Sequence, residues 1–464
     1  MVGKNVLKVS SNAELLSYII NQNPILSAEI DLPVQGQDIR PIGKLIMDNE
    51  RYRNAFINTV NIIGLTVIKR NRWENPWDFT VRGTLTRGQT IREIILDLCN
   101  VHSYNENVNN VTKFLETEVP NVLNYLHNIN FQVYYQTTTS DEQLAMAFET
   151  EGGLLTFIEE SVSMLWESKV YDEYIIDKYM LCRRILDGTM TSIEIEDFDT
   201  KTARERVSDM KSISNKMSFR SPDYNPAGIR RATSFDNQMF ILNTDFEAAM
   251  STEVLATSFF RDDADFKARA VLCDGFGKHD TERLKEVLKE QYVDFTTEEL
   301  QALSNIPAVI ISREWFMDYY YGMDNSSVGK QTEFYNPTTL KNNHYLHIWG
   351  IKSTSPFENG VVFTAGVAPS VTAVSVSPSE SSLSAGLSLH LTATVKTTGF
   401  ANKAVTWSIT KGAEDGKAKI NESGLLTISK DYPVITDPST PQIEVTATSI
   451  YNNTVTGKAN ITVL

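Results

Sequence analysis

The sequence predicts two structural units: a body of mixed helices and strands, of the α+β class, and an all-β sandwich at the C-terminus. Composition changes abruptly at Phe363–Pro369, and Ser and Thr supply 28 of the 96 residues from Pro369 onward. Beyond this point apolar and polar residues alternate in short runs, as in Leu387–Val395. A period of two is typical of antiparallel strands with one buried face. Before this point, helical three- and four-residue spacings mix with short apolar runs.

The N-terminal residues 1–63 are predicted to form an arm and helices. A capped helix should cover residues 11–23, and the Pro- and Gly-punctuated stretch Pro33–Gly43 should be an extended arm. A second helix should run from about Lys44 to Asn61, and Gly64–Arg70 has the apolar character of a strand.

Residues 71–88 concentrate large rings and arginines in a segment broken by Pro and Gly: Trp73, Trp77, Phe79, Arg82 and Arg87. Two interpretations are open at this point. Either the rings pack onto their own domain, or the segment is a projecting hairpin whose rings are buried by another subunit.

A long helix is predicted after Gly152-Gly153. Apolar residues recur at three- and four-residue steps from Leu154 to about Leu186, and Gly188 follows as a C-terminal stop. At ~1.5 Å per residue such a helix would be roughly 50 Å long, which suits a spine that spans a domain.

A second mixed region follows the long helix. It is predicted to hold two buried strands, two helices and two strands that return to the body before the sandwich: Phe240–Leu242 and Ala308–Ser312, 280–292 and 297–303, His344–Trp349 and Gly360–Thr364. The second helix has a capping box, in which Thr296 precedes Glu299 by three residues.

Charge and composition limit the function classes. The formal net charge is −15, and all of it lies on the body because the sandwich has seven Lys against seven Asp and Glu. A body this acidic should not bind nucleic acid through phosphates. The three scattered cysteines argue for a reducing compartment. With no apolar signal segment and no run of about 20 apolar residues, we expect a soluble protein made in the cytoplasm, with no membrane partner.

Three fragments invite a chemical interpretation, and each has a simpler one. Gly275–Lys278 lacks the spacing of a phosphate-binding loop, and the acidic run Glu194–Asp199 lacks the positions of a calcium loop. His344 and His347 should point to opposite faces of a strand. The local signatures of hydrolases, metalloproteases and dinucleotide-binding enzymes are missing. We therefore predict no catalytic residue, no cofactor and no metal ligand.

Stretches distributed in order through the chain carry a resemblance to a known family: Gly64–Ile68, Gly88–Ile94, Glu118–Val122, Val133–Gln136 leading into 137–148, Ala308–Met317, Tyr345–Trp349, and Phe363–Pro369 leading into Val374–Pro378. They resemble the major capsid proteins of phi-29-like short-tailed bacteriophages, which have the Hong Kong 97-type capsid fold. The resemblance implies an N-arm, an extended loop (E-loop), a long spine helix, and peripheral and axial domains.

The resemblance also implies a division of the chain. The expected parts are 1–63, arm and helices; 64–135, the E-loop region; 136–190, the peripheral domain with the spine helix; 191–343, the axial domain with an insertion at 277–305; 344–368, return strands of the peripheral domain; and 369–464, an immunoglobulin-like domain.

The C-terminal residues resemble the group-two bacterial immunoglobulin-like module that capsid subunits of this group can carry. The resemblance rests on Val374–Pro378, Val405–Ser408, Gly424–Ile428 and Val445–Thr448. The core of this sandwich is expected around Leu389, Leu391, Trp407 and Val445, with Trp407 between the sheets.

The resemblance implies a structural major capsid protein with no catalytic step, located in the virion. Copies are expected to form hexamers and pentamers with a scaffolding protein and a portal, or connector. The icosahedral or prolate shell would enclose viral double-stranded DNA without binding it specifically. Residues 71–88 and 1–43 would lap over neighbours.

The interface residues expected in the first lapping segment are Trp73, Trp77 and Phe79 as apolar anchors and Arg82 and Arg87 as partners of neighbouring acids. The immunoglobulin-like domain is expected outside the shell, where it either strengthens contacts between subunits or touches the host surface.

Two alternatives compete with a shell protein. A virion or cell-surface binding protein would use the sandwich for carbohydrate adhesion, and a polysaccharide hydrolase would carry it as an accessory domain. The order-preserving resemblance through residues 64–369 disfavours the first, and the missing catalytic signatures disfavour the second.

Overall fold

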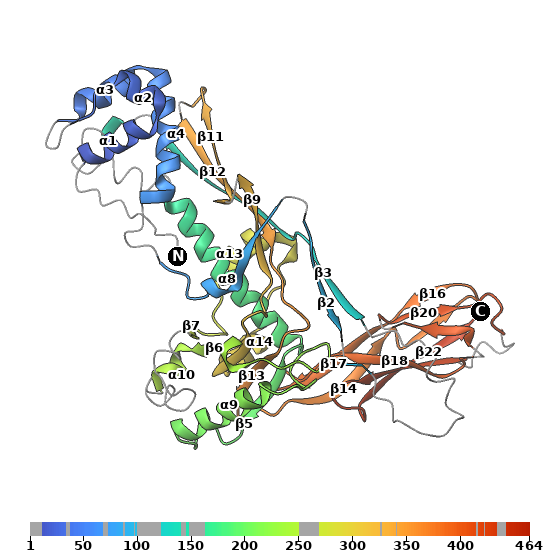
Figure 1. Ribbon diagram of the computed structural model, residues 1–464. Helices are drawn as coiled ribbons and strands as arrows, with labels where there is room; N and C mark the ends of the chain where they lie inside the picture. The colour runs from blue at the N-terminus through green and yellow to red at the C-terminus, as the bar shows by residue number, and fades with distance from the viewer. Residues whose placement is uncertain are drawn as a thin grey trace, which may run out of the picture.

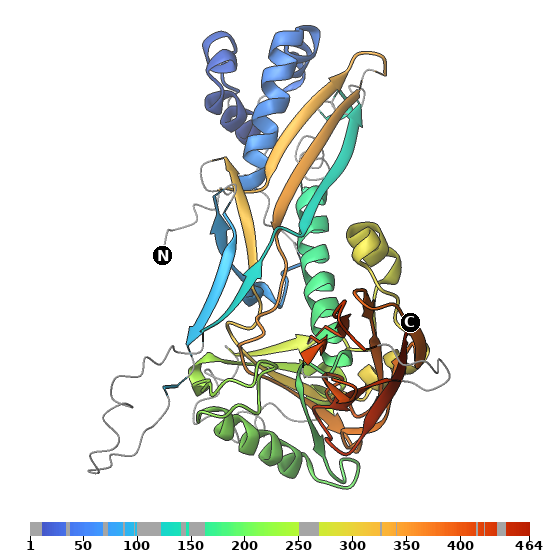
Figure 2. The same ribbon diagram turned by 90° about the vertical axis from the view of Figure 1, so that its right-hand side faces the viewer.

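The protein has an elongated body from which a hairpin and a β-sandwich project. The structure is a computed structural model that describes residues 12–464 except 34–37, 68–72, 87–88, 97, 100–121, 141–144, 148–162, 250–268, 325–326, 340, 414–415, 422 and 434–441. A helical bundle lies at one end of the body, a domain built on a five-stranded sheet lies at the other, and a long helix runs between them (Figure 1). The hairpin and the sandwich both lie to the right of this long helix in Figure 1, and Figure 2 shows them apart from each other.

The N-terminal bundle consists of four helices: α1 (Asn12–Gln22), α2 (Pro24–Glu29), α3 (Arg40–Asp48) and α4 (Glu50–Val67). Its core is formed by buried apolar residues of α1 and α4, among them Leu16, Ile20 and Phe56. The Asn23 side chain caps α2 by accepting a hydrogen bond from the Ile25 amide at 2.9 Å.

Three predictions for this region are wrong in detail. The arm predicted over Pro33–Gly43 is helical from Arg40, because Pro41 lies in the first turn of α3, where a missing N–H is tolerated. The helix predicted over 44–61 is two helices, since Asn49 is extended between them. The predicted strand Gly64–Arg70 begins as the last turn of α4, and residues 68–70 lie outside the described part of the chain.

The long helix α8 (Met164–Leu186) is the spine that the sequence predicts. Residues 154–162 of the predicted helix lie outside the described part of the chain. The helix ends at Gly188, whose φ of +68° is the left-handed conformation that closes many helices. Arg183 and Arg184 lie in the last turn, where positive charge is favoured by the helix dipole.

A six-stranded sheet lies along one side of the body. Its strands are β1 (Val81–Leu85), β4 (Phe131–Ser140), β9 (Asp318–Asp324), β10 (Ser327–Val328), β11 (Lys330–Asn336) and β12 (Lys341–Ile351). The longest ladder is antiparallel, with β4 beside β12 from Phe131 opposite Gly350 to Ser140 opposite Lys341.

A five-stranded sheet forms the other domain. Its strands, in spatial order, are β5 (Thr191–Ile195), β13 (Gly360–Ala365), β8 (Ala308–Ser312), β6 (Gln238–Asn243) and β7 (Ala270–Cys273). Successive residues of β6 and β8 alternate between two cores. Phe240 and Ile310 face the helix α9 (Ala203–Met217), whereas Ile241 belongs to the core that contains α8. Because both faces are covered, these strands are continuously apolar, as predicted.

The two predicted return strands belong to different sheets. β12 lies in the six-stranded sheet, whereas β13 pairs with β5 and β8 in the five-stranded sheet. The predicted region 344–368 therefore supplies one strand to each of the two sheets, and its two strands do not form one unit. Sequence alternation cannot show which sheet a strand joins, because that depends on partners far away along the chain.

The predicted insertion 277–305 contains α13 (Thr281–Leu288), the short 3₁₀ helix η5 (Lys289–Gln291) and α14 (Thr297–Ser304). The predicted capping box is present, since the Thr296 hydroxyl accepts from the Glu299 amide at 3.2 Å and Glu299 accepts from the Thr296 amide at 2.9 Å. Arg283 joins α13 to the spine through both carboxylate oxygens of Asp172, at 2.8 and 3.0 Å.

The C-terminal sandwich consists of three sheets: β14 (Ser370–Ser377) with β17 (Thr392–Thr398); β15 (Glu380–Leu383), β22 (Thr456–Val463), β21 (Ile443–Ser449) and β18 (Val405–Lys411); and β16 (Ser388–His390), β20 (Leu425–Ile428) and β19 (Ala418–Ile420). Of the four expected core residues, Leu391 and Val445 are fully buried. Leu389 and Trp407 are partly buried and pack against that core.

The aromatic segment around the 3₁₀ helix η1 (Asp78–Thr80) packs onto its own body. Trp77 is fully buried, its Nε1 donates to the Leu272 carbonyl at 3.0 Å, and its ring lies edge-on to Tyr174. Phe79 is partly buried against the same core. The projecting-hairpin interpretation is therefore wrong for this segment, and Trp77 offers no surface to a neighbour. Arg87 lies outside the described residues.

Trp77→Ala should lower the free energy of unfolding by about 3–5 kcal/mol, because it leaves a large cavity in the core. Trp73→Ala is the matched control: that ring is 48% exposed, so the loss should be about 1 kcal/mol or less. Chemical denaturation of the unassembled subunit measures both. Equal losses in the two variants would contradict the assigned burial.

Candidate subunit interface

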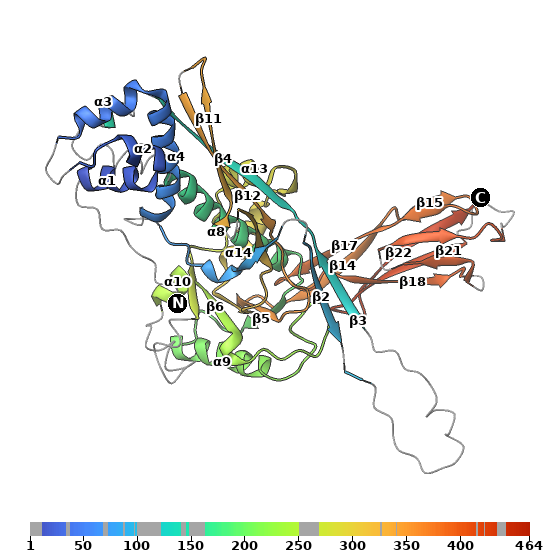
Figure 3. The same ribbon diagram turned by 45° about the horizontal axis from the view of Figure 1, so that its top comes forward.

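The projecting element is a two-stranded hairpin formed by β2 (Ile91–Leu96) and β3 (Val122–His127) (Figure 3). The strands are antiparallel, with Ile91 opposite His127 and Leu96 opposite Val122. Within the described part of the chain they pair with each other alone. A two-stranded sheet is marginally stable in water, so this hairpin depends on other surfaces for support.

One face of the hairpin is apolar and uncovered. Directly opposite residues of an antiparallel pair share a face, which places Ile94 and Leu96 of β2 beside Val122 and Leu126 of β3. Ile94 is 57% exposed and Leu96 is 63% exposed. The same face also carries Arg92, opposite Leu126, and Asn124, opposite Ile94. Exposed apolar side chains gathered on a projecting element are typical of a protein–protein contact.

The other face meets the body at its root. His127 is almost completely buried, with Nδ1 2.9 Å from the Ser353 hydroxyl and Nε2 3.1 Å from a carboxylate oxygen of Glu93. Three residues further along, the Asn130 side chain donates to the Lys352 carbonyl at 2.6 Å and accepts from the Lys352 amide at 2.8 Å. The chain that leaves the hairpin is therefore fixed to the segment 352–353.

Lys352 continues this connection into the interior. Its ammonium group donates to Asp177 of the spine at 2.8 Å and to Asp318 of β9 at 2.6 Å, and all three side chains are buried. The Thr80 hydroxyl donates to the second oxygen of Asp177 at 2.7 Å. Thr80 directly precedes β1, on the chain that leads into the hairpin. Both chain segments that flank the hairpin are thus tied to one carboxylate of the spine helix.

The charges of this Lys352 cluster do not cancel if both carboxyls are ionised. Burial raises the pKa of Asp318 well above its usual value, and the neighbouring Asp177 raises it further, against the effect of Lys352. Burial alone would lower the pKa of Lys352, but Asp177 and Asp318 outweigh it and the net shift is upward. The raised pKa of Asp318 favours its neutral form, which reduces the cost of burying this cluster.

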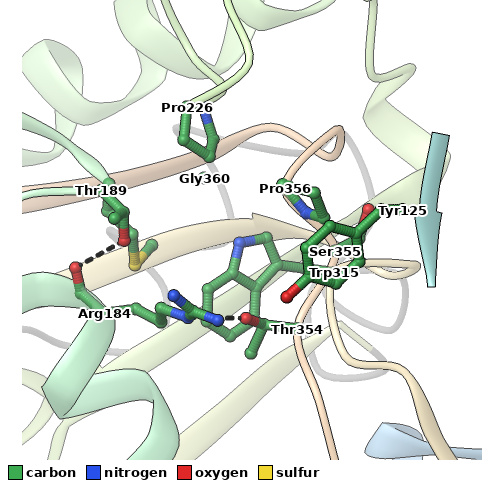
Figure 4. A pocket seen from close by; sticks show the side chains of 10 residues that line it. Tyr125, Arg184, Thr189, Pro226, Trp315, Thr354, Ser355, Pro356 and Gly360 are labelled. Atoms are coloured by element: carbon green, nitrogen blue, oxygen red, sulfur yellow. Dashed lines mark hydrogen bonds between the residues drawn. The ribbon is translucent and has the colours of Figure 1, made fainter. Parts of the chain in front are cut away.

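A small cavity of about 120 Å³ lies where the hairpin root meets the body (Figure 4). Tyr125 of β3 lies at its edge, and Trp315 and Pro356 supply apolar walls. Arg184 is the one charged residue among those that line it, and its Nε donates to the Thr354 hydroxyl at 2.9 Å. One arginine that is hydrogen-bonded to a hydroxyl does not make an acid–base pair. The geometry of this cavity therefore supports a role in packing the hairpin root against the body.

Arg82, predicted as a partner of neighbouring acids, is engaged within its own chain. It lies 3.3 Å from Glu314, which also contacts Arg231 at 3.6 Å. Arg231 pairs in turn with the buried carboxylate of Glu358. Of the predicted interface residues that the structure describes, Trp73, Trp77, Phe79 and Arg82, none lies in the exposed patch. Trp73 is the one ring among them with a largely exposed surface.

The sequence places this hairpin within the expected E-loop region 64–135 but assigns the interface residues to 71–88. A local signal for the strands was present, because Ile91–Leu96 and Val122–His127 are rich in Ile, Leu, Val and Tyr and have the length of strands. The Lys352 cluster has no comparable signal, because Lys352 lies 175 residues from Asp177 and 34 from Asp318 in the sequence.

The described residues show no site of another kind. No cluster of three or more His, Cys, Asp or Glu able to hold a metal occurs among them. His344 contacts Thr139 and His347 contacts Thr332, on opposite faces of β12. None of the helices in the described ranges combines the length and apolar character needed to cross a bilayer.

A projecting hairpin, a long spine helix and two sheets are the elements expected of a Hong Kong 97-type capsid subunit. The chain belongs to the Phi29-like phage major capsid protein family, whose family model matches residues 27–364. A second family model, the bacterial Ig-like domain of group 2, matches residues 370–431. The protein is thus a structural component of a bacteriophage shell that self-associates in the virion. Neither match favours the adhesin alternative or the hydrolase alternative.

Individual relatives agree with this assignment. The chain is 28% identical to the major capsid protein of Bacillus phage PZA over 92% of its own length and 86% of that protein. It is also 28% identical to the major capsid protein of Bacillus phage GA-1, over 99% and 94% of the two chains. A chain in the structure of head fiber and inner core protein gp22 of native bacteriophage P68 has 14% identity and a TM-score of 0.46, with 64% and 86% covered.

Lys352→Met should destabilise the unassembled subunit by about 3–5 kcal/mol, because it leaves buried carboxyls without their ammonium partner. Adding Asp177→Asn should recover part of the loss, since the remaining charge is then removed. Urea denaturation of the single and double variants measures both effects. A double variant no more stable than Lys352→Met would contradict the pairing.

Asp318→Asn should change how stability depends on pH. The folded pKa of Asp318 is raised, so folding takes up a proton and wild-type stability falls as pH rises from about 4 through the folded pKa. The amide of the variant does not titrate. The free energy of unfolding of the variant, relative to that of wild type, should therefore rise with pH by up to about 1.4 kcal/mol per pH unit. Denaturation curves at several pH values test this, and a difference independent of pH would contradict it.

Proposed function

We propose that the hairpin β2–β3 laps over a neighbouring subunit and buries its apolar face there. The observation that carries this proposal is the exposed patch of Ile94, Leu96, Val122 and Leu126 on an element that has no second layer of its own. One contact of this size contributes a modest free energy of association, but closed symmetry repeats the contact around every ring of subunits.

The hairpin replaces residues 71–88 as the first lapping element in this proposal. It lies within the 64–135 E-loop region expected from the sequence. The N-terminal bundle, which lies at the far end of the body from the five-stranded sheet, is the second element we assign to contacts with neighbours (Figure 1). We assign the five-stranded sheet, including β13, to the axial domain and the six-stranded sheet with α8 to the peripheral domain, although β9, β10 and β11 of the six-stranded sheet fall within the predicted axial range 191–343.

The wider assembly is part of the same proposal. Copies form hexamers and pentamers around a scaffolding protein and a portal, and the closed shell holds double-stranded DNA without a catalytic step. The net charge of −15, carried by the body, supports a wall that repels packaged DNA and does not bind it. The neutral sandwich projects away from the body (Figure 1), and we assign it to the outside of the shell.

Ile94→Asp should prevent shell assembly while leaving the subunit folded. The side chain is largely exposed in the free subunit, so the free energy of unfolding should change by less than about 1 kcal/mol, whereas a buried unpaired charge in the interface would be costly. Electron microscopy of the variant expressed with its scaffolding protein gives the result.

Phe219→Asp is the matched control, because Phe219 is 73% exposed and lies outside the hairpin, on the segment after α9. It should assemble into normal shells. Normal shells from Ile94→Asp would overturn the lapping role of the hairpin.

A further inference from the structure

The sandwich is attached to the body by a loop as well as by the chain itself. The loop between β17 and β18 contains Gly399 and Phe400, with φ of +57° and +60°. Phe400 is 9% exposed and belongs to the hydrophobic core of the body, not to the core of the sandwich. A left-handed conformation is unfavourable for a residue with a Cβ and persists where its surroundings fix it.

The same loop touches the end of the spine helix. The helix is closed by hydrogen bonds from the Gly188 amide to Ile185 at 3.0 Å and from the Thr189 amide to Arg184 at 3.2 Å. A Cβ at Gly188 would lie 2.8 Å from the Asn402 Cα, which is too close for any side chain. The backbones of the helix end and of the sandwich loop are therefore in direct contact.

The inserted helices complete this contact. A cavity between α14 and the loop is lined by residues of the spine, the insertion, the join and the sandwich, including Leu186, Ala302, Val367 and Phe400. The insertion is fastened to α8, because the Arg183 guanidinium donates to the Asp294 carbonyl at 2.7 Å and Arg283 pairs with Asp172. Figure 2 shows α13 and the sandwich on the same side of α8.

The chain that joins the two units is held on both sides. In the body, the Thr364 hydroxyl donates to the Val367 carbonyl at 2.8 Å and the Gly366 amide donates to Ile195 at 3.3 Å. In the sandwich, the Tyr451 hydroxyl donates to the Pro369 carbonyl at 2.9 Å. A join with these hydrogen bonds is not a free hinge.

We infer that the immunoglobulin-like domain is a brace for the spine helix: Phe400 is seated in the body and holds the C-terminal end of α8 and the inserted helix α14 in position. The side chain that fills this site on the body belongs to the sandwich of the same chain. The insertion 277–305 therefore lies on the same face of the subunit as the sandwich. This inference goes beyond the lapping hairpin and holds for either surface of the shell.

Hydrogen exchange of full-length, unassembled subunits tests the brace. In Phe400→Ala, amides of the last turn of α8 and of α14 should exchange at least about tenfold faster than in wild type, while β21 and β22 keep their protection. Leu425→Ala is the control, since Leu425 is an exposed apolar residue of the sandwich (37%) and does not line the joint. It should leave α8 and α14 unchanged.

Two results would overturn the inference. One is unchanged exchange of α8 and α14 in Phe400→Ala; the other is faster exchange confined to the sandwich, which would mean that Phe400 supports its own domain. If Phe400→Ala fails to fold, Phe400→Leu takes its place, because it keeps an apolar side chain of smaller size. It should show an intermediate increase in exchange at the same two helices.

Discussion

The pairing of Lys352 with Asp177 and Asp318 is the interaction on which the arrangement of this subunit depends. Among the described residues, the spine helix, the six-stranded sheet and both chain segments that flank the hairpin meet at this buried cluster. Burying three ionisable groups is costly, and the cost is reduced by direct hydrogen bonds and by the raised pKa of Asp318, which favours its neutral form. Because a displaced partner leaves a buried charge, the cluster penalises any shift of the hairpin relative to the spine.

The spine helix is thus held at two places of different chemistry. In its middle, Asp177 is fixed by charge and hydrogen bonds; at its C-terminal end, Gly188 abuts the sandwich loop and the body's core is completed by Phe400. The inserted helices add Arg283 and Asp172 along one side. By the inferred brace, the sandwich contributes to the rigidity of the capsid subunit's body and is more than a domain displayed on the surface of the shell.

The sequence predicts what is encoded locally and fails where distant partners decide. The capping box at Thr296, the buried strand around Ile241 and the stop at Gly188 depend on neighbours within a few residues, and all are present. The sequence leaves open whether the Trp77 ring packs on its own domain, because the residues around it, Leu272 and Tyr174, lie far along the chain. The break at Asn49 is a single extended residue inside an otherwise helical pattern, so periodicity passes over it.

The central claim is that the apolar residues of the hairpin contact a neighbouring subunit, and that the Lys352 cluster fixes the hairpin relative to the spine helix. The most direct measurement is an electron cryomicroscopy reconstruction of assembled shells that resolves side chains. The account predicts that Ile94, Leu96 and Leu126 are covered by a neighbouring subunit at every position in the shell. A closed shell in which this face of the hairpin remains in contact with solvent would contradict it.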